Sequence, residues 1–127
     1  MAVSDEDVKR LLEGFELYNA GQFDAIIDWV APDFVMDRDG GLPPLRGREE
    51  LRRFWEPDAF EWQRFEPQSV EVRGDKVLMT VVIRSKGAGS SIELGFTGWM
   101  VWTADDGLVT HLLVTRDESA AREHFES

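Results

Sequence analysis

Four strand-like runs follow one another between residues 70 and 117, and short turn signals separate them. The turn signals are Gly74-Asp75, the glycine-rich segment 87–91 and Asp106-Gly107. Glycine-containing turns of this kind join antiparallel neighbours in a sheet. The chain before this part reads mainly as helix, apart from one short strand-like run at 33–39. Helices followed by an antiparallel meander are typical of an α+β domain in which the helices cover one face of the sheet.

The first helix has clear signals at both ends. Ser4 precedes three acidic residues, which is the pattern of an N-cap with negative charge in the first turn. Apolar side chains then recur three and four residues apart, and Asn19-Ala20-Gly21 ends the helix. Gly14 lies in the middle of the apolar face, where glycine costs about 1 kcal/mol relative to alanine. We therefore expect a neighbouring group to need the space at Gly14.

The remaining elements follow from the same helical and strand periodicities. Pro32 and Pro57 are expected to end the second and third helices. Gly95 and Gly98 suggest a bulge or a bend in one long strand. We expect helices at 23–30, 46–55 and 118–125, and strands at 34–38, 70–73, 77–84, 92–103 and 108–116.

The composition narrows the classes of function. With 127 residues and 43% apolar content, the chain is expected to form one domain over residues 1–127. The absence of cysteine excludes disulfides, thiolate metal sites and a cysteine nucleophile. A net charge of −11 disfavours nucleic acid and anionic membranes as partners. No signal peptide, membrane span, metal or cofactor is expected, and a cytoplasmic location is predicted.

Five stretches of the chain carry the residue pattern of a known family. They read FELYNAGQFDA at 15–25, APDF at 31–34, LRGREELRRF at 45–54, VWTADDG at 101–107 and TRDESA at 115–120. In this order they resemble the SnoaL-like (polyketide cyclase-like) branch of the nuclear transport factor 2-like, or ketosteroid isomerase-like, superfamily. The resemblance implies a curved antiparallel sheet forming a half-cone, with three N-terminal helices over its concave face and a pocket between them. It also implies a homodimer, expected through the outer face of the sheet.

The best-known catalytic groups of this superfamily are missing from the chain. Ketosteroid isomerases use an aspartate base, a tyrosine and a protonated aspartate. By the resemblance, these positions fall on Arg38, on Gly14 and near Gly98, and an arginine stays protonated and cannot act as the base. Limonene-type epoxide hydrolases need two aspartates, but their last-strand acid falls on Val114 and the strand at 77–84 has no acid. Neither activity is expected.

The two histidines are weak candidates for catalysis. SnoaL cyclases use an aspartate and a histidine on the sheet, and His111 lies on the last predicted strand. Strand alternation places His111 on the face opposite Leu112 and Val114, and by the resemblance the latter two line the cavity. His111 is therefore expected on the outer or dimer face, unless a bulge breaks the alternation. His124 lies in the terminal helix, so the pocket histidines of scytalone dehydratase-like sites are not expected either.

Alternation and helical faces select the side chains that are expected to point into the pocket. Aromatic residues dominate this set, because they supply large apolar contact area with a few polar tips. The alternative for each tryptophan is an ordinary core position. The predicted ligand-pocket residues are Trp29, Met36, Trp55, Trp62, Met100, Trp102, Leu112, Val114 and Arg116.

Arg38 is the most distinctive of the candidate catalytic residues. Inside an apolar cavity its charge needs a partner, and a ligand carboxylate, phenolate or enolate suits the planar guanidinium. The alternative is a surface arginine paired with a surface acid. Asp37 and Asp39 point the other way by alternation, but either would serve as a base if the strand twists at Gly40-Gly41. Tyr18 would donate a hydrogen bond to the ligand.

The sequence therefore predicts a pocket protein that binds a small, mostly apolar organic molecule, either with or without an anionic group. If the protein is an enzyme, we expect a cofactor-free isomerase, cyclase or dehydratase. The first alternative is a non-catalytic binder or accessory dimer, which would lack a carboxylate within reach of the cavity. The second is a cavity filled by its own aromatic side chains, which a volume under about 100 Å³ would indicate.

Overall fold

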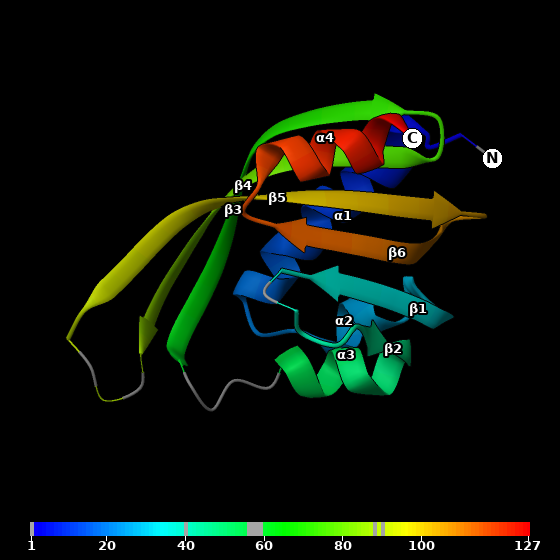
Figure 1. Cartoon of the computed structure of the whole chain (residues 1–127). Coiled ribbons are helices and arrows are strands. Elements are labelled where there is room, and N and C mark those ends of the chain that lie inside the picture. Colours follow the sequence, from blue (N-terminus) through cyan, green and yellow to red (C-terminus); the bar gives the residue numbers. More distant parts are fainter. Residues whose placement is uncertain (1, 40, 56–59, 88, 90) are drawn as a thin grey trace.

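A curved, unclosed sheet of six strands forms the centre of the computed structural model, which describes residues 2–39, 41–55, 60–87, 89 and 91–127 (Figure 1). The strand order is β2-β1-β6-β5-β4-β3. The pair β1–β6 is parallel, and the other neighbours are antiparallel. The strands are β1 Val30–Arg38, β2 Leu45–Arg46, β3 Phe60–Arg73, β4 Lys76–Gly87, β5 Glu93–Asp105 and β6 Leu108–Thr115. The predicted α+β class with a curved antiparallel meander is confirmed.

The helices lie on both faces of this sheet. They are α1 Asp5–Asn19, α2 Asp24–Ile27, α3 Gly47–Trp55 and α4 Glu118–Glu126. In Figure 1, α1 lies behind the sheet and α4 in front of it. The prediction of three N-terminal helices over the concave face is inexact, because α2 is a single turn and α3 packs against β1 and β2 at the sheet edge. None of the helices in the described part of the chain has the length and apolar character of a membrane span.

Local sequence signals account for both ends of α1. The amide of Asp7 donates to Ser4 Oγ at 3.1 Å, and the amide of Ser4 donates to Asp7 Oδ2 at 3.0 Å, which completes a capping box. After the last turn, Gly21 has φ +76°, the left-handed conformation that favours glycine. A methyl group built on Gly14 would lie 3.6 Å from the ring of Trp29. Trp29 therefore packs close to the helix backbone at this glycine.

Two boundaries differ from the prediction. The predicted helix at 23–30 is wrong beyond Ile27, because Val30 begins β1 and Pro32 lies inside that strand. The β1–β6 register shifts between Val30 and Val35, and such an irregularity tolerates a proline that cannot donate to the ladder. The strand predicted at 70–73 is much longer, since β3 begins at Phe60 and pairs with β4 throughout. Pro57, the predicted end of the third helix, lies outside the described residues.

Cross-strand register separates the two faces of the sheet as alternation predicts. Met36 pairs with Leu112, Leu112 with Trp102, and Trp102 with Val77, so these four side chains share the concave face. The concave core packs under α1 around Phe15, and a second core packs under α4 on the convex face. The β4–β5 register is unbroken at Gly95 and Gly98. The β5–β6 register shifts between Thr103 and Ala104, where Thr110 is an extra residue on β6. The first part of β5, before its pairing with β6 begins at Trp99, curves away from β6 (Figure 1).

Candidate functional site

A cavity of about 270 Å³ lies between α1 and the concave face of the sheet. Its walls are almost entirely aliphatic and aromatic, and they come from all of the long elements except α4. Tyr18 lines it, together with most of the predicted pocket residues: Trp29, Met36, Trp55, Met100, Trp102, Leu112 and Val114. Further lining residues that the sequence analysis did not select include Arg10, Phe15, Gln63, Phe65 and Phe96.

Tyr18 is the main hydrogen-bonding group of the cavity. It lies near the C-terminal end of α1, and its hydroxyl donates to Gln63 Oε1 on β3 at 3.2 Å. Burial raises the pKa of Tyr18 to about 12, because the low-dielectric surroundings disfavour the phenolate. Tyr18 therefore stays protonated near neutral pH and presents a neutral donor.

A second polar group lies where α1 meets the β5–β6 hairpin. Arg10 Nη1 donates to the carbonyl of Gly107 at 3.0 Å, and its guanidinium carbon lies 5.7 Å from the ring centroid of Trp29. Asp7 is the one carboxylate among the described residues that line the cavity. Its Oδ2 already accepts the Ser4 amide in the capping box. The cavity thus holds little acid–base chemistry.

Arg38 and Arg116 lie against the cavity wall but not among its described lining residues. The guanidinium of Arg38 lies 5.2 Å from the ring centroid of Phe54, and that of Arg116 lies 4.2 Å from Phe96. Both aromatic rings line the cavity. Arg38 Nη2 donates to the carbonyl of Pro43 at 3.0 Å. Its Nε atom is buried and has no hydrogen-bond partner among the described residues.

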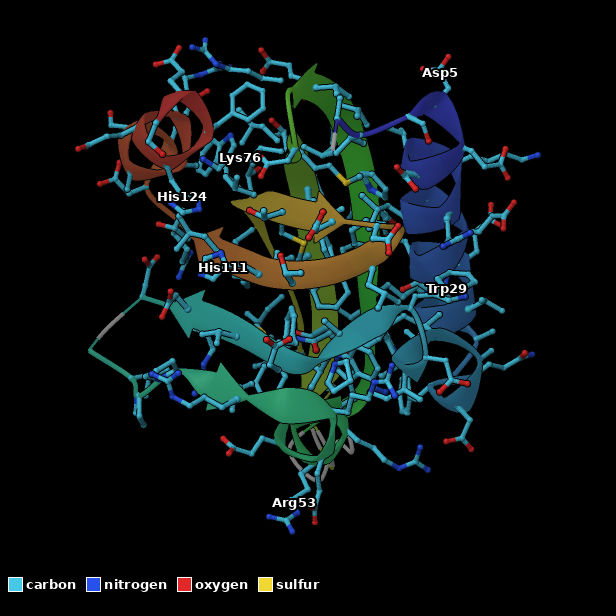
Figure 2. All side chains as sticks on the ribbon, turned by 90° about the vertical axis from the view of Figure 1, so that its right-hand side faces the viewer. Asp5, Trp29, Arg53, Lys76, His111 and His124 are labelled. Carbon is cyan, nitrogen blue, oxygen red and sulfur yellow. The ribbon has the colours of Figure 1, made fainter. Side chains whose placement is uncertain are left out.

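The two candidate bases lie outside the cavity lining. Asp37 Oδ2 is 2.8 Å from His111 Nε2 on the convex face. The His111 ring lies 5.2 Å from that of His124 on α4, and the two labelled histidines lie close together in Figure 2. Asp39 Oδ2 accepts the backbone amide of Arg116 at 2.6 Å, which ties the end of β1 to the end of β6. A twist that turns either acid inward, which the sequence analysis left open, is not seen.

Trp62, a predicted pocket residue, lines a different cavity. This second cavity has the same volume of about 270 Å³ and lies between the turn after α1 and the start of β3. Sequence reasoning missed Gln63 because the segment 60–69 was not predicted as a strand. A local signal was present, because the aromatic residues Trp62 and Phe65 are of the kind that is enriched in strands. Reading this segment as a strand would have placed Gln63 and Phe65 on one face.

Comparison with known proteins now identifies the family. The model of the SnoaL-like domain matches residues 8–112. The chain belongs to this SnoaL-like domain family. No curated protein matches the sequence of the SnoaL-like chain.

Solved structures with similar folds are distant in sequence. An NTF2-like protein of unknown function from Burkholderia pseudomallei has a TM-score of 0.80 at 14% identity, over 98% of this chain and 100% of its own. TerC, co-crystallised with polyporic acid, has a TM-score of 0.78 at 18% identity, over 95% of this chain and 98% of its own. An LEH-like epoxide hydrolase of M. tuberculosis has a TM-score of 0.76 at 15% identity, over 95% of this chain and 90% of its own. These likenesses establish the shared NTF2-like fold.

Proposed function

We propose that this SnoaL-like domain binds a small, mostly apolar organic molecule in the main cavity and does not transform it. The cavity carries the proposal, because it combines about 270 Å³ of space with aromatic walls and a few neutral hydrogen-bonding groups, Tyr18 among them. Apolar walls with a few placed polar groups are typical of small-molecule sites. The volume also disfavours the alternative in which the aromatic side chains fill the space.

An anionic group on the ligand would be held by Arg38. Its guanidinium stacks on Phe54, a lining ring that is 45% exposed and therefore able to move aside. The buried Nε of Arg38, which has no hydrogen-bond partner among the described residues, would gain an acceptor from a carboxylate or enolate. Arg116, stacked on Phe96, adds positive charge at the end of the neighbouring strand.

Cofactor-free acid–base catalysis has less support from the geometry. The candidate bases Asp37 and Asp39 are both engaged outside the described cavity lining. Asp7, which does line the cavity, is committed to the cap of α1. A general base must reach the proton that it removes, and these three carboxylates hold other partners. Relatives in this fold include a protein co-crystallised with an organic acid and an epoxide hydrolase, so both binding and catalysis occur on it.

The test compares a charged probe with a neutral probe of the same shape. Isothermal titration calorimetry would measure the Kd of naphthalene-2-carboxylate and of naphthalene-2-carboxamide. We expect Arg38→Met to weaken the carboxylate about tenfold and to leave the amide within about twofold. Arg73→Met, an exposed arginine at the far end of β3, is the matched control. Failure of both probes to bind the wild-type protein would refute the binding function.

The homodimer through the outer sheet face stays a prediction. On that face α4 already covers Leu78 and Val101, so a partner would use the remaining surface. Sedimentation velocity would measure the oligomeric state. A monomer over the micromolar range would contradict the predicted dimer.

A further inference from the structure

The two cavities share a wall made of two side chains. Tyr18 and Gln63 line both of them, and the hydrogen bond of 3.2 Å between the phenol and the amide oxygen closes the wall. Phe23 and Trp62 also line the second cavity. No other described residue lines both spaces. The Tyr18–Gln63 contact is therefore central to the division between the cavities.

Aromatic rings continue across the wall without a break. The Tyr18 ring centroid lies 4.8 Å from Phe65 in the main cavity and 5.2 Å from Phe23 in the second. Phe23 in turn lies 5.8 Å from Trp55, which lines the main cavity. A planar ligand that crosses the wall would meet the rings of Phe23 and Trp62 on the other side, beside the more polar turn at residues 19–21.

The backbone around the wall is held by contacts that do not involve it. Asn19 donates from Nδ2 to the carbonyl of Phe65 and accepts the Phe65 amide on Oδ1, each at 3.0 Å. These two bonds pin the end of α1 to β3. Because these bonds are separate from the Tyr18–Gln63 bond, separating the two side chains would leave this attachment of the backbone in place.

Volume points to one site rather than two. Ligand pockets usually span about 300–1,000 Å³, and each cavity of about 270 Å³ lies near the lower end of that range. Joined, the two lie well inside that range. A ligand that crosses the wall separates Tyr18 from Gln63, so it must offer a hydrogen-bonding atom at that point to replace the lost bond.

We propose that the two cavities form one elongated site for a molecule with two apolar ring units joined through a hydrogen-bonding oxygen, which Tyr18 and Gln63 bind at the junction. This inference rests on the proposed function and specifies the shape and the polarity pattern of its ligand. Tyr18 remains a donor for such an oxygen, since its hydroxyl stays protonated. Trp62 then contacts the second ring unit.

The test uses three probes that share one anionic ring unit. Naphthalene-2-carboxylate fits the main cavity alone, 6-benzoylnaphthalene-2-carboxylate adds a second ring through a carbonyl, and 6-benzylnaphthalene-2-carboxylate adds it through a methylene. Calorimetry should show the carbonyl-linked probe binding at least tenfold more tightly than each of the other two. Equal binding of the two long probes, or no gain over the short probe, would overturn the inference while leaving the proposed function intact.

Variants locate the effect at the wall. Tyr18→Phe and Gln63→Leu should each remove most of the preference for the carbonyl-linked probe. Trp62 lines only the second cavity, so Trp62→Ala should weaken both long probes at least fivefold and leave the short probe within about twofold of wild type. Gln68→Leu, an exposed glutamine on the same strand, is the control. If both Tyr18→Phe and Gln63→Leu keep the preference for the carbonyl-linked probe, the inference is overturned. If none of the three probes binds the wild-type protein, the proposed function is overturned as well.

Discussion

Both faces of the sheet have an apolar core, but they differ in their polar groups. The concave face, under α1, surrounds the cavity with aromatic and aliphatic groups and the neutral Tyr18–Gln63 pair. The convex face, under α4, adds titratable groups to its core, where His111 contacts both Asp37 and the ring of His124. The difference suggests that pH and charge act on the attachment of α4, whereas shape and apolar area govern the cavity.

The largest expected effect would come from the core under α4. Phe125 is 6% exposed and packs with Leu78 and Val101 on the convex face. Phe125→Ala should lower the free energy of unfolding by about 3–4 kcal/mol, because it removes a buried ring and leaves a cavity. Urea denaturation measures the loss. The folded variant should still bind naphthalene-2-carboxylate with wild-type affinity. A larger Kd would show that packing on the convex face affects binding on the concave face.

The concave counterpart is Phe54→Ala. Phe54 lines the cavity but is 45% exposed, so we expect less than about 1 kcal/mol of destabilisation. Binding of naphthalene-2-carboxylate should nevertheless weaken, because the ring supplies contact area to the site and a surface for Arg38. The same pair of measurements, denaturation and calorimetry, checks both parts. A variant that loses stability but keeps full affinity would place the ligand elsewhere.

The convex face should respond to acid. Burial lowers the pKa of His124 below its usual 6.5, with further lowering from His111 and Lys76 and a smaller opposing effect of Asp37. The unfolded chain therefore takes up this proton more readily than the folded protein. The stabilising contribution is complete above about pH 6.5 and falls as the pH drops towards the lower folded pKa. Free energies of unfolding at pH 7.5 and 5.5 would show the loss.

The contribution of His124 can be separated from general acid effects. His124→Gln should flatten part of this dependence, and the Kd of the neutral naphthalene-2-carboxamide should stay constant over the same pH range. An unchanged slope in the variant would assign the acid sensitivity to other groups.

A smaller effect is expected at Gly14. A methyl group there would lie 3.6 Å from Trp29, which is an ordinary contact distance. Gly14→Ala should therefore raise the free energy of unfolding by up to about 1 kcal/mol through helix propensity. Thermal denaturation measures the gain. A loss of stability would mean that Trp29 cannot accommodate the methyl group, as the sequence analysis supposed for this position.

The smallest expected effect tests the candidate base. Asp37 is about half exposed and pairs with His111, so Asp37→Asn should cost about 0.5 kcal/mol. Calorimetry with the naphthalene probes should detect no change. A severalfold change in Kd would show that Asp37 takes part in ligand binding.

Short-range signals in the sequence predicted the parts of the fold that neighbouring residues decide. Ser4 caps α1 as expected, because a cap involves only residues two or three positions away, and Asp117 caps α4 in the same way. Asp106 and Gly107 form the predicted hairpin with φ of +53° and +80°, since few residue pairs tolerate these angles. Strand alternation likewise placed Met36, Met100 and Leu112 at the cavity correctly.

Long-range pairing decided the site itself. Residues 60–69 form the first part of β3 and are held in the sheet by their pairing with β4. Tyr18 meets Gln63 across 45 positions, and Asp37 meets His111 across 74. Arg38 has the inward register that alternation predicts, yet it stacks on Phe54 and binds Pro43 instead of lining the cavity. Residue order alone determined which side chains face each side of the sheet, and only the packed chain determined which of them touch, because contact depends on the curvature of the sheet and on the positions of α1 and α4.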